Sequence, residues 1–327
     1  MPRFDISLEE LTSFRPDVRE PADFDTFWST TLAAARSLSR EVVLEDAHSP
    51  FVVCEVFDLT FTGFAGDPVR AWLLKPAGEH GPLPAVVEFT GYGSGRGLPS
   101  EHLRWAAAGF AHIVMDTRGQ GSVWGGGGQT PDPHGTGPST PGFMTRGIES
   151  PLDYYYRRVF TDAVCAVDAA RSLPFVDGAR VAVTGASQGG GITIAAAALS
   201  DGLVAVMPDV PFLCHYERAF ELTSRLPYHE VVQYLSVHRG AEERVLSTLS
   251  YFDGVNFAAR ATAPALFSVA LMDDICPPST VYAAYNRYRG QRQINVYPYN
   301  EHEGGQAHHW LAQHAFLTGI LSDSRLV

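Results

Sequence analysis

Residues 181–191 read Val-Ala-Val-Thr-Gly-Ala-Ser-Gln-Gly-Gly-Gly. An apolar run comes before Ser187, and a run of small and apolar residues, 192–199, follows the glycines. In this context the G-x-S-x-G pattern predicts a tight strand-to-helix turn. Small residues two positions before and after the serine let the backbone close and leave the hydroxyl exposed at the helix N-terminus. We therefore expect Ser187 to be a nucleophile at the end of a buried strand.

Short β-rich segments alternate with helical segments on both sides of this turn. Several β-rich segments are continuous apolar runs bounded by Gly, Pro or Asp, which is typical of strands buried on both faces. The expected strands are 51–57, 69–74, 85–89, 111–115, 181–184, 204–207, 265–269 and 294–297. The expected helices are 101–108, 155–171, 191–199, 279–288 and 309–321. This order predicts an α/β fold with a mainly parallel central sheet flanked by helices, and the early, hairpin-like strands predict a mixed edge.

Three stretches depart from this alternation. Residues 1–40 are expected to form a helical lead-in that includes a helix starting near Asp23. Residues 122–150 are rich in Gly, Pro, Ser and Thr and predict a long loop, which in a compact domain indicates either function or disorder. Residues 211–260 show helical patterning without a clear strand, which predicts a helical insertion over one end of the sheet. We expect one domain, 1–327, that carries this insertion.

The composition limits the kinds of partner. The chain has 36 acidic and 24 basic residues and a formal net charge of −12, which argues against binding to nucleic acid or to anionic membranes. No apolar run of about 18 residues predicts a membrane span, and no secretory signal is visible at the start. The 4 cysteines form no CxxC pair, and we interpret them as buried free thiols in a reducing cytoplasm.

A serine nucleophile needs a base, and the base needs a carboxylate that orients it. In enzymes with this turn, the acid and then the histidine follow the serine along the chain. His302 is the best candidate for the base because it lies in the loop after the expected strand 294–297. The histidines of the next expected segment are interpreted as solvated or core-edge side chains: His308, His309 and His314.

The acid should follow the preceding strand, where Asp273 and Asp274 both stand at the end of an apolar run. Neighbouring side chains point in different directions, so only one of the two is expected to reach the base. The spacing favours neither strongly.

Ester hydrolysis also needs hydrogen-bond donors for the oxyanion of the tetrahedral intermediate. The residue after the nucleophile normally supplies one backbone N–H, here that of Gln188. The second donor comes from the loop after an earlier strand, and the backbone N–H of Tyr92 is the candidate. The Tyr92 ring is also a candidate wall of the acyl pocket, which makes Tyr92 an expected substrate-binding residue.

Three ordered motifs resemble the acetyl xylan esterase/cephalosporin C deacetylase family, which is carbohydrate esterase family seven of the α/β-hydrolase superfamily. The motifs are Arg118-Gly-Gln-Gly121, Gly185-Ala-Ser-Gln-Gly-Gly190 and His302-Glu303. The similarity continues through segments 142–147, 154–160, 249–257 and 276–280, so it covers essentially the whole chain.

This resemblance implies an α/β-hydrolase serine esterase that removes acetyl groups from small substrates, among them acetylated xylo-oligosaccharides, acetylated sugars and cephalosporin C. It implies no metal and no organic cofactor. It implies Ser187 as nucleophile, Asp273 as acid, His302 as base, and Tyr92 and Gln188 as oxyanion donors. Arg118 and Gln120 are expected to hold loops near the nucleophile.

The resemblance also implies a homohexamer, a trimer of dimers whose active sites face an enclosed interior. We expect the Gly/Pro-rich loop 122–150, with its glycines 125–128, to contribute to that interface. Residues 306–309 depart from the family pattern, which affects the start of the last helix and not the three catalytic candidates.

Other functions remain as alternatives. A general short-chain carboxylesterase would differ only in specificity, whereas a peptidase would need a gating domain for which 327 residues leave no room. A metallohydrolase would use the histidines near position 302, but H-E-x-x-H spacing requires a histidine where Gln306 stands. A non-catalytic hydrolase-like binding protein is disfavoured because the set of nucleophile, acid and base is complete.

Overall fold

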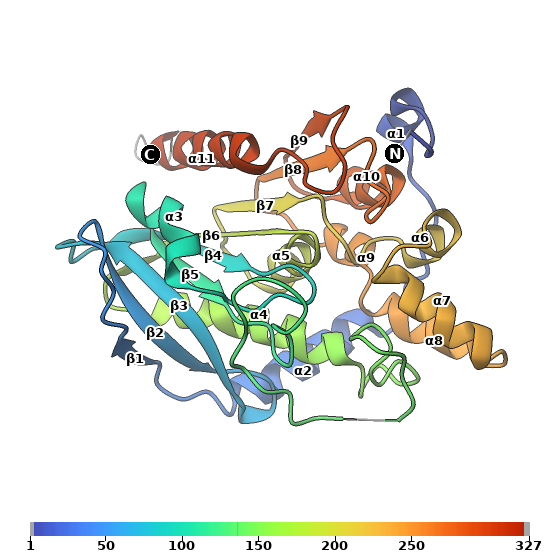
Figure 1. Ribbon diagram of the computed structural model, residues 1–327, viewed down its shortest axis with the longest axis horizontal. Coiled ribbons are helices and arrows are strands. Elements are labelled where there is room, and N and C mark those ends of the chain that lie inside the picture. The colour runs from blue at the N-terminus through green and yellow to red at the C-terminus, as the bar shows by residue number, and fades with distance from the viewer. Residues whose placement is uncertain (1–2, 136, 324–327) are drawn as a thin grey trace.

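The computed structural model describes residues 3–135 and 137–323. The strands of this part of the chain form a nine-stranded mixed sheet (Figure 1). Its strands are β1 (Val43–Asp46), β2 (Cys54–Thr62), β3 (Pro68–Pro76), β4 (Leu83–Phe89), β5 (Ala111–Met115), β6 (Val176–Ala186), β7 (Ala205–Asp209), β8 (Ala265–Ala270) and β9 (Arg292–Tyr297). They lie in the order β1-β2-β3-β5-β4-β6-β7-β8-β9. The pairs from β1 to β5 are antiparallel and those from β5 to β9 are parallel, so the mainly parallel sheet with a mixed edge is confirmed.

Helices cover both faces of this sheet. They are α1 (Leu8–Ser13), α2 (Phe24–Arg36), α3 (Leu103–Ala107), α4 (Tyr155–Ser172), α5 (Gln188–Leu199), α6 (Tyr216–Leu222), α7 (Tyr228–Val237), α8 (Glu242–Ser250), α9 (Gly254–Ala258), α10 (Pro278–Arg287) and α11 (Gln306–Asp323), with 3-10 turns η1 (Phe64–Gly66) and η2 (Pro99–His102). Helices α4, α5 and α10 share the larger apolar core on one face. Helices α3 and α11 enclose a smaller core on the other face, so the sheet lies between two helical layers (Figure 1).

The central strands are apolar because they are covered on both sides. Every residue of β5 and of β8 is buried, which is the burial expected of central parallel strands. Helix α5 consists largely of Gly, Ala and Ile, and its residues 188–197 are all buried. Side chains this small let α5 lie close to β6. Ser187, the residue between β6 and α5, therefore lies at the edge of the sheet.

Two edge strands differ from the sequence-based expectation. Strand β2 spans Cys54–Thr62 rather than 51–57, and Val52 is 89% exposed. Asp58 lies inside β2 because its carboxylate binds the guanidinium groups of Arg70 and Arg96, so the strand carries a charge that an apolar pattern does not predict. Strand β1 was not predicted, because its sequence Val-Leu-Glu-Asp is mostly exposed at the edge and has no apolar run.

The stretch 122–150 forms neither helix nor strand among its described residues, and residue 136 lies outside them. Two of its glycines, Gly126 and Gly128, lie against the backbone of other segments. A methyl group at Gly126 would lie 2.7 Å from the Cα of Gly97, and one at Gly128 would lie 2.5 Å from the carbonyl oxygen of Gln120. The glycines therefore let this loop fold back onto the segments that follow β4 and β5.

Helices α6, α7, α8 and α9 occupy 211–260, and no described residue of this stretch is in a strand. Figure 1 shows α6, α7 and α8 to one side of the sheet. The N-terminal lead-in contains α1 and α2, and α2 begins after Asp23 as expected. A single domain over 1–327 stays a prediction, with 1–2, 136 and 324–327 outside the described residues. In the described chain, no helix combines the length and apolar character that crossing a bilayer requires.

Candidate active site

The turn at Ser187 joins β6 to α5 and has an unusual backbone. Ser187 has φ 56° and ψ −118°, a conformation that a side chain disfavours. The glycines beside it are required by space: a methyl group at Gly185 would lie 2.7 Å from the carbonyl oxygen of Phe89, and one at Gly189 would overlap the same oxygen. The backbone N–H of Ser187 donates to the carbonyl oxygen of Asp209 on β7 (2.9 Å), which ties the turn to the sheet.

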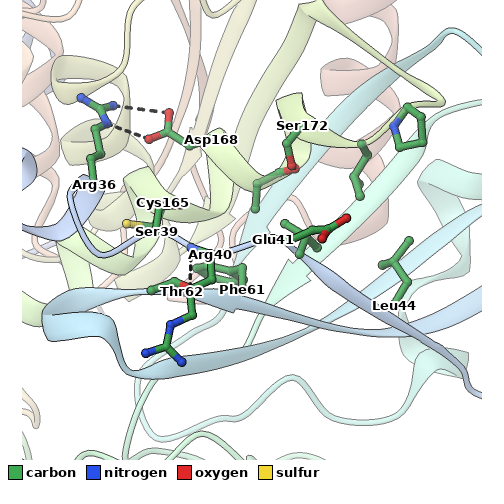
Figure 2. Close-up of a pocket in the computed structure, with 14 residues that line it drawn as sticks. Arg36, Ser39, Arg40, Glu41, Leu44, Phe61, Thr62, Cys165, Asp168 and Ser172 are labelled. Atoms are coloured by element: carbon green, nitrogen blue, oxygen red, sulfur yellow. Dashed lines mark hydrogen bonds and ion pairs between the residues drawn. The ribbon is translucent and has the colours of Figure 1, made fainter.

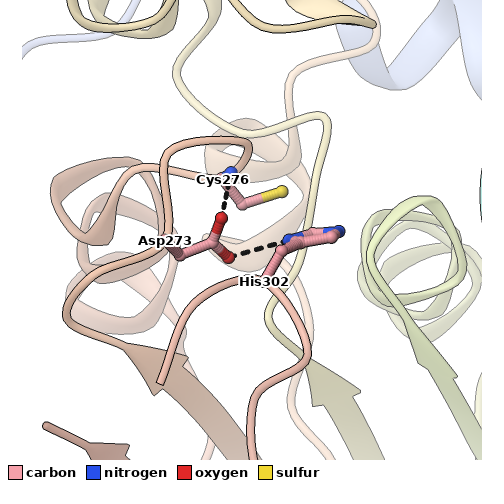
Figure 3. Close-up of side chains that lie close together, drawn as sticks. All are labelled: Asp273, Cys276 and His302. Atoms are coloured by element: carbon pink, nitrogen blue, oxygen red, sulfur yellow. Dashed lines mark hydrogen bonds and ion pairs between the residues drawn. The ribbon is translucent and has the colours of Figure 1, made fainter. Parts of the chain in front are cut away.

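Ser187, His302 and Asp273 are joined by hydrogen bonds. His302 Nε2 lies 2.9 Å from Ser187 Oγ. Figure 3 shows the contact on the other side of the ring, where His302 Nδ1 lies 2.8 Å from Asp273 Oδ2. Asp273 follows β8 and is fully buried, whereas His302 follows β9 and its side chain is 25% exposed. An ionised Asp273 accepts from Nδ1–H, which leaves the lone pair of Nε2 facing the serine hydroxyl. This is the arrangement that a general base needs.

The two adjacent aspartates have separate partners. The Oδ1 atom of Asp273 accepts the backbone N–H groups of Ile275 and Cys276, each at 2.9 Å, so its carboxylate is held in place by the chain that follows it. Asp274 instead pairs with Arg225 Nε at 3.3 Å. The geometry therefore brings Asp273 to the histidine, which sequence spacing alone left open.

Cys276 lies beside this group, and its sulfur and the side chains of Asp273 and His302 could offer three ligand atoms within 4.8 Å of one another (Figure 3). Burial raises the pKa of the Cys276 thiol, which disfavours the thiolate that binds metal. Both carboxylate oxygens and both ring nitrogens are already in hydrogen bonds. The cluster is accounted for by the serine, histidine and aspartate arrangement without a metal.

The two predicted oxyanion donors lie on segments that one side chain connects. Gln188 is the first residue of α5, where a backbone N–H has no partner within the helix. Tyr92 lies in the loop after β4. The side chain of Gln120 accepts the backbone N–H of Gly93 through Oε1 (2.7 Å) and donates through Nε2 to Gln188 Oε1 (2.8 Å). Gln120 therefore links the two donor segments, as the sequence led us to expect.

Arg118, next to this motif, lies in a buried network of carboxylates. Its Nε donates to Asp162 Oδ2 on α4 at 2.6 Å, and its Nη1 donates to Asp67 Oδ2 at 2.9 Å. Asp132, in the Gly/Pro-rich loop, lies 3.5 Å from Nη1. Arg118 thus connects the end of β5 to α4, to the start of β3 and to the long loop.

A separate cavity of about 280 Å³ lies between the end of α2, strand β2 and helix α4 (Figure 2). An ion pair between Arg36 and Asp168 (2.8 Å) borders it, and the buried Cys165 also lines it. Its lining residues include neither the nucleophile candidate nor its partners. We assign this cavity no catalytic role.

The sequence model of the family described as "Acetyl xylan esterase (AXE1)" matches residues 1–320. This chain belongs to the acetyl xylan esterase family. A solved acetyl xylan esterase from Paenibacillus sp. R4 is 37% identical, with a TM-score of 0.91 over 96% of this chain and 99% of that one. Acetyl Xylan Esterase 1 from Thermoanaerobacterium sp. JW/SL YS485 is 35% identical, with a TM-score of 0.89 over 97% of this chain and 99% of that one.

A curated member with a longer chain, acetyl esterase Axe7A of Xylanibacter ruminicola, is 28% identical over 299 residues. The match covers 88% of this chain and 65% of that protein, so the chain spans less than two thirds of its length. Membership in the acetyl xylan esterase family confirms the predicted α/β-hydrolase fold and places the chain among carboxylic ester hydrolases.

Two residues near the site of this acetyl xylan esterase family member were not anticipated from the sequence. Glu230 on α7 accepts the hydroxyl of Tyr92, and Trp124 in the long loop donates through Nε1 to the backbone carbonyl of Tyr92 (2.6 Å). Neither residue belongs to a recognisable motif. A contact across 138 positions leaves no periodic signal in a single sequence.

Proposed function

We propose that this chain is a serine esterase that removes acetyl groups from small acetylated substrates: acetylated xylo-oligosaccharides, acetylated sugars and cephalosporin C. The observation that carries the proposal is the hydrogen-bonded chain from Ser187 Oγ through His302 to Asp273 at a strained turn. Family membership supports ester chemistry independently of this geometry.

In the first step, His302 Nε2 takes the proton of Ser187 as the hydroxyl oxygen attacks the acetyl carbonyl. Asp273 holds the ring in the required tautomer and stabilises its positive charge. The backbone N–H groups of Tyr92 and Gln188 bind the oxygen that becomes negative, and each such donor contributes about 3–4 kcal/mol in known cases.

In the second step, the tetrahedral intermediate collapses. The bond to the alcohol oxygen breaks, His302 gives that oxygen the proton, and the alcohol leaves an acetyl group on Ser187. Water then attacks the acetyl-enzyme with His302 as base, and acetate leaves as the serine recovers its proton.

The test is a series of initial rates on p-nitrophenyl esters with acyl chains of two to eight carbons, alongside acetylated xylose and cephalosporin C. We expect kcat/KM to be highest for the acetyl ester. We also expect Ser187→Ala to lower the rate by on the order of 10⁴-fold or more while leaving the circular dichroism spectrum unchanged. A preference for long acyl chains would overturn the deacetylase proposal, and retained activity of the serine variant would overturn the mechanism.

We also propose that the chain forms a homohexamer and that the loop 122–150 contributes to its interfaces. The resemblance to the family supports this, as do Val123 and Trp124, which are exposed apolar side chains in that loop. Light scattering coupled to size-exclusion chromatography should give the mass of six chains, and the mass of a monomer would contradict the proposal.

The 4 cysteines are buried and free, which supports a location in the reducing cytoplasm.

A further inference from the structure

Glu230 is a buried carboxylate on helix α7 of the insertion, with 2% of the residue exposed. Its Oε1 accepts the hydroxyl of Tyr92 at 2.5 Å, and its Oε2 accepts the backbone N–H of Met144 at 3.0 Å. Burial raises the pKa of Glu230. Burying a carboxyl group costs free energy unless the group is hydrogen-bonded. The two hydrogen bonds that offset this cost also hold the Tyr92 hydroxyl and the Met144 N–H in place.

Tyr92 is held at its far end and at its backbone. Its hydroxyl donates to Glu230 and accepts the backbone N–H of Phe143 at 2.6 Å. Its carbonyl oxygen accepts Trp124 Nε1 at 2.6 Å, and the next backbone N–H donates to Gln120 at 2.7 Å. When the following peptide plane and the end of the side chain are both held, the Cα, Cβ and carbonyl carbon of Tyr92 are held, and with them the position of its backbone nitrogen. Rotation about the N–Cα bond is then the remaining freedom of the Tyr92 N–H.

We propose that Glu230 is a positioning residue that orients the backbone N–H of Tyr92 for the oxyanion. This inference rests on the proposed function, because it concerns the same site. It gives the helical insertion a role in the reaction: α7 supplies a carboxylate that acts on the oxyanion loop through the tyrosine side chain.

A glycine in the long loop makes room for this carboxylate. Gly142 has φ 130°, and a methyl group at its Cα would overlap the carboxylate carbon and both oxygens of Glu230. The backbone of 142–144 therefore lies directly against the carboxyl group of Glu230. Three segments meet at this point: the loop after β4, the loop before α4, and helix α7.

The test compares Glu230→Gln, Tyr92→Phe and the double variant with the wild-type protein on p-nitrophenyl acetate. Glutamine keeps the size of the side chain but presents an N–H group to one of the two donors that the carboxylate accepts. We expect kcat to fall on the order of tenfold in each single variant while KM changes less than about twofold. The double variant should be slowed by less than the product of the two single effects, since the two side chains share one hydrogen bond.

A boronic acid that forms a tetrahedral adduct with Ser187 provides a readout that a purely structural role would not change. Its inhibition constant should rise by the same factor by which kcat/KM falls, because the adduct places an oxygen in the oxyanion site. Tyr92→Phe removes only a hydroxyl, so it serves as the test if the Glu230 variant does not fold.

The same helix offers a matched control. Tyr234 on α7 donates its hydroxyl to Glu149 Oε1 at 2.7 Å, which is also a tyrosine-to-glutamate hydrogen bond but does not involve the oxyanion loop. Glu149→Gln and Tyr234→Phe should leave kcat and the inhibition constant unchanged.

Unchanged kcat and unchanged boronic acid binding in the folded Glu230→Gln and Tyr92→Phe variants would overturn the inference, even if their melting temperatures fell. A wild-type protein without esterase activity would overturn the proposed function and this inference together. An active wild type with unaffected variants would overturn only the inference.

Discussion

Ser187 keeps a backbone conformation that its own side chain disfavours, and its neighbours hold it there. The sheet binds its N–H, while the space at positions 185 and 189 admits only glycine. A strained nucleophile turn therefore depends on two positions that do no chemistry. Replacing either glycine should lower both the free energy of unfolding and the rate of ester hydrolysis.

Gly189→Ala tests this dependence. The added methyl group would overlap the carbonyl oxygen of Phe89, so helix α5 must shift away from β4. We expect a loss of about 1–3 kcal/mol in the free energy of unfolding, together with a clear fall in kcat. Urea unfolding and p-nitrophenyl acetate rates measure the two effects.

The control is Gly319→Ala, in the exposed part of helix α11, where no atom lies within 4 Å of the added methyl group. That change should stabilise the protein by about 0.5–1 kcal/mol, because alanine loses less conformational freedom than glycine in a helix. If both variants behaved alike, the account of close packing at the nucleophile turn would be wrong.

At the residue scale, the sequence predicted what local motifs encode. The G-x-S-x-G pattern gave Ser187, and position after a late strand gave His302. The choice between Asp273 and Asp274 needed either the family resemblance or the structure, since both end the same strand. Glu230 was not predictable, because its partner Tyr92 lies 138 positions away and a buried glutamate looks like any helical glutamate.

At the scale of elements, Arg118 joins the end of β5 to helix α4. Asp162 is buried with it and accepts two hydrogen bonds from it, so removing the guanidinium would leave this buried carboxylate without the arginine that it binds. We expect Arg118→Met to lower the free energy of unfolding by about 3–5 kcal/mol, measured by urea unfolding.

Helix α4 provides the comparison, since Arg36 pairs with Asp168 on the same helix at the surface. Arg36→Met should cost only about 0–1 kcal/mol, because water screens an exposed pair. Equal losses in the two variants would mean that burial of the pair does not determine its contribution.

Elements with a strong apolar pattern were predicted well, and polar edge elements were not. Strand β5 was found at the expected residues 111–115, since all five of its residues are buried. Strand β2 begins three residues later and ends five residues later than expected, and β1 was missed. In both, the strand is stabilised by pairing at a partly exposed edge, and Asp58 within β2 is satisfied by arginines from other segments.

At the scale of the whole molecule, the site exists because the parallel strands end together. Ser187, Asp273 and His302 follow β6, β8 and β9, so three loops separated by up to 115 positions meet at one edge of the sheet. The alternation of strands and helices predicted the mainly parallel sheet, whereas the three residues at its edge were predicted from motifs, from their order along the chain and from the family resemblance. The contacts of the insertion with the oxyanion loop were not, because they depend on how α7 packs and not on its periodicity.

The central claim is that Ser187 is the nucleophile and that His302 activates it. The most direct measurement is covalent labelling with diethyl p-nitrophenyl phosphate, followed by mass spectrometry of the peptides. We predict one phosphoryl group per chain on the peptide that contains Ser187, no label in Ser187→Ala, and labelling slowed by orders of magnitude in His302→Ala. Label on another residue at full stoichiometry, or unchanged labelling without His302, would contradict the account.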